Sequence, residues 1–310
     1  MQSAPRTIVV LGTGGTIAGR AGSPDQHLAY TSAVLPVEQL LAALPAGGGE
    51  LVSASEQVAQ VDSKDMDFAI WRRLAEAVER HLARPEVRGV VITHGTDTLE
   101  ETAYFLARVV DASKPVVLTA AMRPASSSEA DGPANLASAI VVAAHADPGV
   151  VVVLASQVHS ARAVRKVHPS RLDAFSSGEQ GPLAQIVAGT VRPLHAWPTE
   201  APSIGLANLP EDPAAWPWVE IVTAVAGADG RAVDLLVQGG VAGIVVAATG
   251  NGTLHRRLEH ALLQARARGV AVLRSTRCGE GRVLPPADDV ADRLTPAKAR
   301  VELMLRLAGG

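Results

Sequence analysis

Two short apolar runs, each followed by a turn rich in glycine and threonine, constrain the fold of this chain more than any other feature. The runs are Ile8–Leu11 and Val90–Ile92, and the turns follow at 12–16 and 93–98. Their β-branched residues predict strands, and unbroken apolar runs are typical of strands buried on both faces. A helical segment follows the second turn, and its first turn holds Glu100 and Glu101, which suit the helix dipole. The pattern predicts strand–turn–helix units and hence a parallel sheet.

The first turn, Gly12-Thr13-Gly14-Gly15-Thr16, permits three functional interpretations. A dinucleotide-binding fingerprint would need a small residue where Ile17 stands and an acidic residue about 20 positions further on, after a second strand, and both are missing. A phosphate-binding loop would need a Gly-Lys-Ser/Thr sequence, yet the first lysine is Lys64. A hydroxyl nucleophile, Thr16, would lie at the carboxyl end of its strand, where ligands bind in open α/β sheets. Taken alone, the turn favours a simpler alternative, in which the Thr16 hydroxyl bonds its own backbone.

The second turn repeats this layout with two hydroxyls and a carboxylate, at Thr96, Asp97 and Thr98. One interpretation is helix capping by Asp97 or Thr98, with Glu101 completing a capping box with Thr98. Capping accounts for Thr98, but it does not explain why two apolar strands of one domain both end in threonine-rich turns. The two turns together therefore favour a functional site.

The rest of the chain continues the alternation of strands and helices. The residue pattern predicts strands at 58–61, 116–119 and 150–155, helices at 37–44, 66–82 and 136–146, and an irregular hairpin at 157–167. A proline-rich segment without periodicity, 192–213, predicts a linker. Beyond it we expect strands at 219–222, 244–247 and 271–275, with helices near 233–237, 254–268 and 297–307. The fold class is therefore α/β, with a larger domain at 1–191, whose parallel sheet has helices on both faces, and a smaller α/β domain at 214–310.

Charge and cysteine content exclude several classes of function. The 28 basic and 31 acidic residues give a formal net charge of −3, which offers no electrostatic footprint for nucleic acid. Cys278 is the single cysteine, so the fold does not depend on an internal disulfide. No cluster of histidine, cysteine and carboxylate residues has the spacing of metal ligands, so neither a metal nor another cofactor is expected. No apolar run approaches the roughly 18–20 residues that span a membrane, and the N-terminal residues are too polar for a signal peptide. These features predict a cytoplasmic protein that contacts no membrane.

Two segments, Thr13–Gly19 and Ile92–Ala103, resemble the two signature segments of the bacterial-type L-asparaginase and glutaminase-asparaginase family. Further segments that resemble this family are Tyr30-Thr31, Asp62–Met66, Lys114–Val117, Ala121–Pro124, Ala130–Leu136, Lys166, Gly250–Gly252 and Pro296–Arg300. The resemblance covers nearly the whole chain, and the two signatures together are very specific.

The resemblance implies an amidohydrolase that converts L-asparagine to L-aspartate and ammonia through a threonine-linked acyl-enzyme intermediate. It implies that the catalytic residues are Thr16, Tyr30, Thr96, Asp97 and Lys166. It implies that the substrate-binding residues are Gly15, Ser63, Lys64, Thr96, Asp97, Asn251 and Glu280. Residues 20–32, which lack periodicity, would form a mobile lid over the substrate.

The resemblance also implies a homotetramer of tight dimers, in which the smaller domain completes the active site of a neighbouring subunit. Family members extend a glutamate across that interface. This chain is shortened at the corresponding place, around 277–281, and Glu280 is the candidate equivalent.

Amide hydrolysis needs a nucleophile, a proton acceptor and a stabiliser for the oxyanion. Thr16 is the preferred nucleophile with Tyr30 as its partner, yet Thr96 can also attack, and the sequence does not decide between them. Lys166 could act as the base through Thr96 if its pKa is lowered, whereas a neighbouring Asp97 favours the charged ammonium. Asp97 can instead hold the α-ammonium group of the substrate.

Several alternatives stay open. Lys64 stands where family members have an uncharged amide, and its cation could strengthen carboxylate binding or simply lie in solvent. One methylene separates asparagine from glutamine, so a dual glutaminase-asparaginase is an alternative. Others are a non-catalytic amino-acid-binding protein of the same fold and the amidase subunit of a tRNA-dependent amidotransferase, which the lack of RNA-binding charge disfavours.

Overall fold

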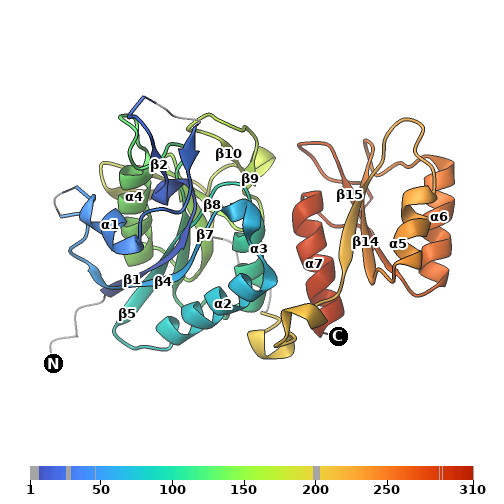
Figure 1. Cartoon of the computed structure of the whole chain (residues 1–310), viewed down its shortest axis with the longest axis horizontal. Coiled ribbons are helices and arrows are strands. Elements are labelled where there is room, and N and C mark those ends of the chain that lie inside the picture. The colour runs from blue at the N-terminus through green and yellow to red at the C-terminus, as the bar shows by residue number, and fades with distance from the viewer. Residues whose placement is uncertain are drawn as a thin grey trace. The chain divides into compact units, whose positions relative to one another are not determined.

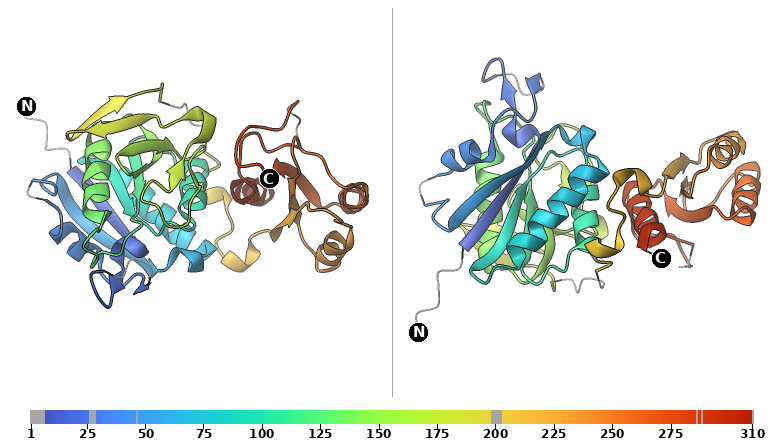
Figure 2. Two further views of the ribbon diagram at one scale, coloured as in Figure 1. Left: turned by 90° about the horizontal axis from the view of Figure 1, so that it is seen from above. Right: turned by 60° about the horizontal axis from the view of Figure 1, so that its bottom comes forward.

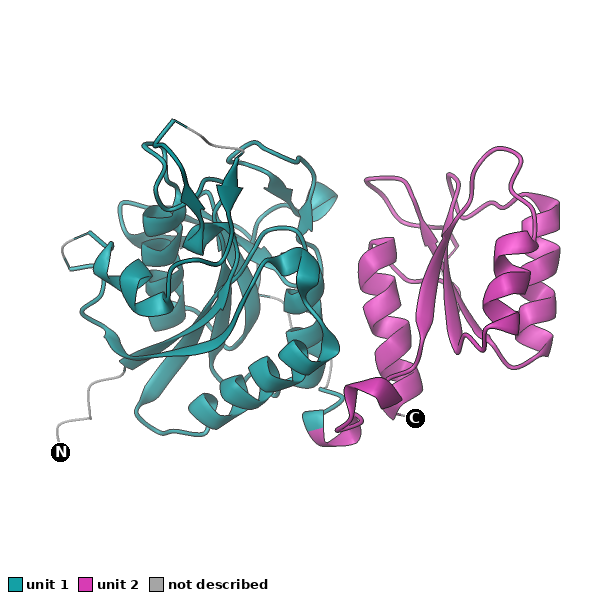
Figure 3. Ribbon diagram, in the orientation of Figure 1, with its two compact units in different colours: residues 1–206 teal, residues 207–310 magenta. Residues whose placement is uncertain are grey.

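The chain forms two compact units, residues 1–206 and 207–310, in a computed structural model (Figure 3). The structure describes residues 7–25, 29–45, 47–197, 203–285, 287 and 289–309. The boundary between the units falls inside the segment 192–213 that the sequence marks as a linker. Each unit has its own sheet and its own hydrophobic core, so each is described by itself.

An eight-stranded sheet forms the centre of the first unit, in the order β12-β11-β8-β7-β6-β5-β1-β4 (Figure 1). Five neighbouring strands run parallel, namely β4 (Val52–Val61), β1 (Thr7–Gly14), β5 (Val87–Thr93), β6 (Pro115–Thr119) and β7 (Gly149–Leu154). Three strands continue the sheet antiparallel, namely β8 (Gln157–Ser160), β11 (Ala184–Val187) and β12 (Thr190–Pro193). The predicted parallel sheet is therefore confirmed for five strands, and its antiparallel extension is a feature that the sequence did not reveal. β12 reaches Pro193, two residues into the segment predicted as linker.

The antiparallel extension begins with a two-residue turn between β7 and β8. Ala155 and Ser156 both have positive φ, at 47° and 59°. Such turns normally carry Asn-Gly or Asp-Gly, so Ala-Ser gives no hairpin signal. The side chain of Asn135 stabilises the turn, because its Oδ1 accepts a hydrogen bond from Ala155 N at 3.1 Å.

Four helices cover the two faces of this sheet (Figure 2). The helices are α1 (Val37–Ala42), α2 (Phe68–Leu82), α3 (Leu99–Val109) and α4 (Gly132–His145). On one face α1 and α4 share a core with alternate residues of the central strands. On the other face α2 packs against α3, where Trp71 stacks on Phe105 with ring centroids 4.8 Å apart. Helices on both faces of the larger sheet are thus confirmed.

The second unit is built around three parallel strands in the order β13-β14-β15. They are β13 (Val219–Thr223), β14 (Gly243–Ala248) and β15 (Ala271–Thr276), and the helices are α5 (Arg231–Gln238), α6 (Arg256–Ala267) and α7 (Pro296–Gly309). Helices α5 and α6 enclose a core with Ile244 and Val246, while α7 contacts all three strands (Figure 1). The smaller α/β domain is confirmed by this sheet and these helices.

Short elements complete the described part of the chain. They are the ribbon of β2 (Arg20–Ala21) with β3 (Tyr30–Thr31), the ribbon of β9 (Arg165–Lys166) with β10 (Phe175–Ser176), and the 3-10 helices η1 (Thr16–Ala18), η2 (Ser63–Asp65), η3 (Gly178–Gln180), η4 (Leu206–Asn208) and η5 (Pro213–Ala215). Among the described residues, no helix is both long and apolar enough to cross a bilayer.

Candidate active site

The carboxyl ends of β1 and β5 are adjacent in the parallel sheet, so the turns that follow these strands meet. A Cβ at Gly15 would overlap the backbone of Gly95, and a Cβ at Gly95 would lie 2.5 Å from Ser63 Oγ. Gly15 also has a φ of 79°, which side-chain-bearing residues rarely adopt. Glycine at both positions therefore lets three turns close together, those after β1, β5 and β4.

Thr16 is the first residue of η1, directly after this contact, and its side chain is buried. Its Oγ1 lies 2.8 Å from the phenol oxygen of Tyr30, and either hydroxyl can donate the proton. Tyr30 belongs to β3, which pairs with β2 just beyond η1. The structure thus brings together the two hydroxyls that the sequence pointed to. Residues 26–28 of the predicted lid lie outside the described residues.

Lys166 brings a second group together on the neighbouring turn. Its Nζ donates to Thr96 Oγ1 at 2.9 Å and to Asp97 Oδ1 at 2.6 Å. Thr96 is buried, the Lys166 side chain is 19% exposed and the Asp97 side chain is 54% exposed. The Asp97 carboxylate therefore binds the ammonium of Lys166 through Oδ1 while more than half of its side chain faces solvent.

Ser63 links the turn after β4 to the same group. Its Oγ accepts a hydrogen bond from Asp97 N at 3.1 Å, and its carbonyl oxygen accepts from Thr98 Oγ1 at 2.7 Å. Thr98 stands at the N-cap of α3 but its side chain makes no capping bond. The capping-box interpretation of Thr98 is therefore wrong, because its hydroxyl joins two turns instead.

Lys64 forms ion pairs with two acidic neighbours. Its Nζ lies 3.1 Å from Asp62 and 3.0 Å from Asp65, and its side chain is 62% exposed. The Asp65 and Asp62 carboxylates raise the pKa of the Lys64 ammonium. Burial raises the pKa of Asp62, but hydrogen bonds from Lys64 outweigh it and hold that pKa below its usual value. In this arrangement the cation of Lys64 lies in solvent.

The two predicted residues of the second unit have separate surroundings. Asn251 Nδ2 donates to Leu284 O at 2.6 Å, and Asn251 Oδ1 accepts from Leu284 N at 2.7 Å. These bonds tie the turn after β14 to residue 284. Glu280 is exposed in the bend that follows β15.

Two further residues support the site, although the sequence gave them other roles or none. Glu100, read from the sequence only as a helix-dipole acid, accepts a hydrogen bond from Lys166 N at 3.1 Å through its Oε2 and so holds β9 beside α3. His94 is fully buried, and its Nδ1–H donates to Gly95 O at 2.7 Å. Burial lowers the pKa of His94 to about 4, so the imidazole is neutral near neutral pH.

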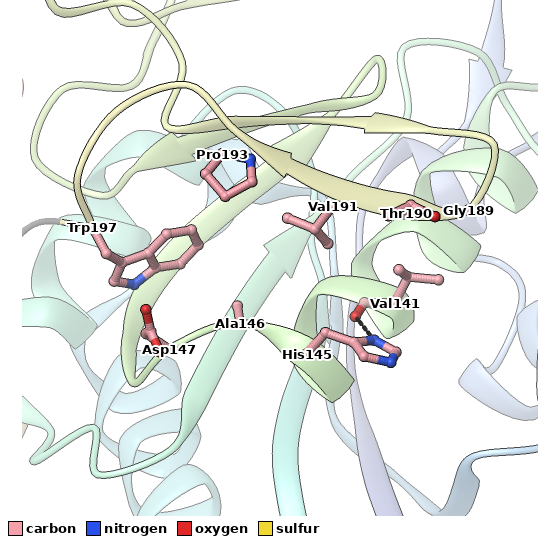
Figure 4. A pocket seen from close by; sticks show the side chains of 9 residues that line it. All are labelled: Val141, His145, Ala146, Asp147, Gly189, Thr190, Val191, Pro193 and Trp197. Carbon is pink, nitrogen blue, oxygen red and sulfur yellow. Dashed lines mark hydrogen bonds between the residues drawn. The ribbon is translucent and has the colours of Figure 1, made fainter.

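A pocket of about 340 Å³ lies elsewhere in the first unit, between the C-terminal end of α4 and β12 (Figure 4). It is lined by Val141, His145, Asp147, Val191 and Trp197 among others, near the amino end of β7. None of the predicted site residues lines it. Among the residues that the structure describes, no group of histidine, cysteine and carboxylate side chains is placed to hold a metal ion.

The arrangement at the strand ends has the parts that acyl transfer needs. A buried hydroxyl with a hydroxyl partner can act as a nucleophile, and an ammonium bonded to a second hydroxyl and a carboxylate can move or hold a proton. The exposed carboxylate edge of Asp97 and the hydroxyl of Ser63 suit the charged ends of an amino acid.

Comparison with known proteins extends this picture to the whole chain. Residues 7–198 match the family model "Asparaginase, N-terminal", and residues 218–310 match "Glutaminase/Asparaginase C-terminal domain". The chain is 38% identical to L-asparaginase 2 of Bacillus subtilis (strain 168), with 97% of this chain and 82% of the relative covered. It is 38% identical to L-asparaginase 2 of Escherichia coli (strain K12), with 97% and 88% covered, and 35% identical to the glutaminase-asparaginase of Pseudomonas fluorescens biotype A, with 97% and 86% covered.

A solved structure of a probable cytoplasmic L-asparaginase from Campylobacter jejuni superimposes with a TM-score of 0.90 at 37% identity and covers 98% of this chain and 95% of its own. Two family models that together span most of the sequence, and relatives above 30% identity over nearly full length, leave one conclusion: the chain belongs to the asparaginase family.

Proposed function

We propose that this protein is an L-asparaginase, which hydrolyses the side-chain amide of L-asparagine to L-aspartate and ammonia. The observation that carries the proposal is the pairing of Thr16 with Tyr30 beside the Thr96–Asp97–Lys166 group. Thr16 and Thr96 lie at the carboxyl ends of the adjacent strands β1 and β5. The family relatives that cover most of the chain are named L-asparaginase or glutaminase-asparaginase.

In the proposed reaction Thr16 Oγ1 attacks the side-chain carbonyl carbon of the substrate, and the Tyr30 hydroxyl relays the proton: it takes the proton of Thr16 as it gives its own to the amide nitrogen. The C–N bond breaks, ammonia leaves with a proton, and an ester joins Thr16 to the aspartyl group. Water then hydrolyses the ester and restores the hydroxyl. The backbone N–H of Thr96 is the proposed donor to the oxyanion.

Thr96 is the alternative nucleophile. Its hydroxyl accepts from Lys166 Nζ at 2.9 Å, and attack by Thr96 would need Lys166 to be a neutral amine. That Nζ also donates to Asp97 Oδ1 at 2.6 Å, so it is engaged as a donor to both neighbours. We therefore assign the first attack to Thr16 and a proton-handling role to Thr96 and Lys166.

Substrate binding is proposed at the charged ends of the amino acid. The exposed oxygen of Asp97 accepts from the α-ammonium group, and the Ser63 hydroxyl donates to the α-carboxylate. The N–H of Gly15 is not free to bind the substrate, because it donates to Val61 O at 2.9 Å. Gly15 is proposed to contribute by lacking a side chain, which lets the substrate approach the backbone closely. Lys64 has no part in this proposed binding, because its exposed ammonium is paired with the Asp62 and Asp65 carboxylates.

Asn251 and Glu280 are proposed to act on the site of a neighbouring chain in a homotetramer of tight dimers.

A cytoplasmic location is also part of the proposal. The similar solved structure is described as cytoplasmic, whereas a Haemophilus influenzae relative, 37% identical, is named a probable periplasmic L-asparaginase. Fractionation of the native cells with an antibody to the chain decides between the two compartments.

A dual glutaminase-asparaginase is the second candidate, because relatives of both names match the chain at 35–38% identity. A pocket distinguishes substrates that differ by one methylene by only about 1–3 kcal/mol. Ammonia release from L-asparagine and L-glutamine, measured side by side, separates the two functions.

The decisive experiment compares the wild type, Thr16→Ala, Thr96→Ala and the exposed control Thr190→Ala. We expect release from asparagine by the wild type and the control, and a loss of several orders of magnitude in Thr16→Ala. Hydroxylamine traps an aspartyl ester on the enzyme as aspartyl hydroxamate. If Thr96→Ala forms this hydroxamate and Thr16→Ala does not, the ester is on Thr16. Folded wild type that releases ammonia from neither amide would instead favour an amino-acid-binding protein.

A further inference from the structure

A short loop between β6 and α4, residues 124–128, contacts the segment that carries Tyr30. The base of this loop is held firmly, because the Asp131 carboxylate accepts hydrogen bonds from Met122 N at 3.0 Å and Arg123 N at 2.9 Å. The loop contains three consecutive serines, at 126–128. Neither the catalytic nor the substrate-binding residues proposed above belong to it.

Hydrogen bonds at three positions along this loop join it to residues 19–24. Ala125 N donates to Gly19 O at 3.0 Å, and Ser128 N donates to Pro24 O at 3.2 Å. Between these two backbone bonds, Ser126 Oγ accepts from Ala21 N at 2.8 Å. The central bond of the three therefore depends on a side chain.

The residue that Ser126 holds lies directly opposite Tyr30. Ala21 of β2 pairs with Tyr30 of β3 in the two-stranded ribbon. The ring of Tyr30 also packs closely at the base of the ribbon, because a Cβ at Gly19 would lie 3.0 Å from Tyr30 Cδ2 and 3.4 Å from Pro124 Cβ. The loop thus contacts the ribbon on the side where Tyr30 reaches Thr16 Oγ1, 2.8 Å away.

We propose that Ser126 is a positioning residue for Tyr30. Its hydroxyl holds Ala21 in place through the hydrogen bond to Ala21 N. Because Ala21 pairs with Tyr30 in the β2–β3 ribbon, this bond also holds Tyr30 where its phenol bonds Thr16. The catalytic consequence rests on the proposed function, but the position of Tyr30 can be measured without any reaction. A proton transfer depends steeply on such a position, since misplacement by about 1 Å can reduce a rate about a hundredfold.

Fluorine NMR of the full chain labelled with 3-fluorotyrosine tests the positioning directly. The chain has two tyrosines, and the second, Tyr104 on α3, is 2% exposed and serves as an internal reference. In Ser126→Ala we expect the Tyr30 resonance to shift or broaden while the Tyr104 resonance stays in place. Ser126→Thr, which keeps the hydroxyl, restores the wild-type spectrum.

Ser128→Ala is the matched control, because Ser128 bonds Pro24 through its backbone N–H and its Oγ lies 3.5 Å from the same oxygen. It leaves both resonances unchanged. In kinetics with L-asparagine, Ser126→Ala lowers kcat about three- to tenfold, the size expected for one lost hydrogen bond, with a smaller change in KM. Ser126→Thr recovers kcat.

An unchanged Tyr30 resonance in Ser126→Ala overturns the proposal. A shift of both tyrosine resonances overturns it too, since that result means a general loss of structure. A selective shift of Tyr30 in a protein that releases no ammonia supports the positioning role and refutes the proposed function alone.

Discussion

A threonine hydroxyl is a weak nucleophile, so the surroundings of Thr16 decide whether it can react. Thr16 is buried and its Oγ1 is bonded to another hydroxyl, that of Tyr30, whereas Thr13 donates to the backbone oxygen of Thr93 at 2.9 Å. Both threonines belong to the same glycine-rich segment, 12–16, with Thr13 in β1 and Thr16 in η1. The difference between them is a difference of partners, which is a property of the folded chain.

Tyr30→Phe removes the hydroxyl 2.8 Å from Thr16 Oγ1 and leaves the ring in place. If the Tyr30 hydroxyl relays the nucleophile's proton, we expect kcat for asparagine to fall about 10²–10⁴-fold with a small change in KM. Steady-state ammonia release measures both constants. Tyr104→Phe on α3 is the control and keeps its activity; a Tyr30→Phe enzyme as active as the wild type would remove Tyr30 from the mechanism.

His94 makes stability depend on pH. Burial lowers its pKa from 6.5 to about 4 in the folded chain, so the unfolded chain binds one more proton between these values. The contribution of neutral, buried His94 to the free energy of unfolding is therefore fully present above pH ~6.5. It is lost as the pH falls toward ~4, and the total loss is about 3 kcal/mol.

Denaturant titrations of the wild type and of His94→Gln across this pH range check the prediction. The slope of unfolding free energy against pH is expected to be shallower in His94→Gln, because the shifted proton-binding site is gone. His145→Gln, at an exposed position on α4, keeps the wild-type slope. Equal slopes in all three proteins would mean that His94 titrates normally in the folded state.

At the scale of elements, the site is a contact between turns. The turns after β1 and β5 touch at Gly15 and Gly95, and η2 adds Ser63. The residue pattern predicted the strands and their order along the chain. It did not predict the direct contact of Gly15 with Gly95, because pairing of parallel strands is a long-range choice that local propensity does not encode.

Gly95→Ala tests this contact. The added Cβ would lie 2.5 Å from Ser63 Oγ and 3.1 Å from Gly15 Cα, so the turns must separate. We expect kcat/KM for asparagine to fall more than about a hundredfold while the folded sheet persists by circular dichroism. Gly49→Ala, whose Cβ would lie 3.7 Å from Leu44 Cδ1, is the control with normal activity.

Two element boundaries show why sequence reasoning falls short. The structure extends β4 over Val52–Val61, whereas the residue pattern indicated only 58–61. β4 is an edge strand with mostly half-buried residues, so the polar residues at 53 and 55–57 are compatible with it and conceal it from a search for apolar runs. The opposite edge, β8, β11 and β12, was concealed by the Ala155-Ser156 turn, which lacks the usual residues.

At the scale of the molecule, each unit has a complete core, and the proposed assembly would join several chains. Leu235 on α5 and Leu263 on α6 are 68% and 58% exposed, an exposure that a contact with another chain would reduce. These residues suit a subunit interface, but exposed leucines also occur singly on monomers.

We expect light scattering coupled to size-exclusion chromatography to give the mass of four chains. Dilution below the dissociation range is expected to lower activity per chain, because the proposed Asn251 and Glu280 contributions come from a neighbour. A particle with the mass of one chain and constant specific activity would contradict both the tetramer and the shared site.

The sequence by itself determined the α/β class, the larger and smaller α/β parts, the five parallel strands and the identity of the residues at their ends. Those conclusions follow from local patterns, since apolar runs, glycine turns and helix periodicity act over a few residues. The resemblance to the family also predicted that Thr16 meets Tyr30, and only the tertiary structure decided several other contacts.

It gave Thr98 to Ser63 rather than to a helix cap, turned Lys64 toward two acidic neighbours and placed Glu100 behind Lys166. The physical reason is that hydrogen-bond partners far apart in sequence are chosen by packing of the whole sheet, where each contact depends on all the others.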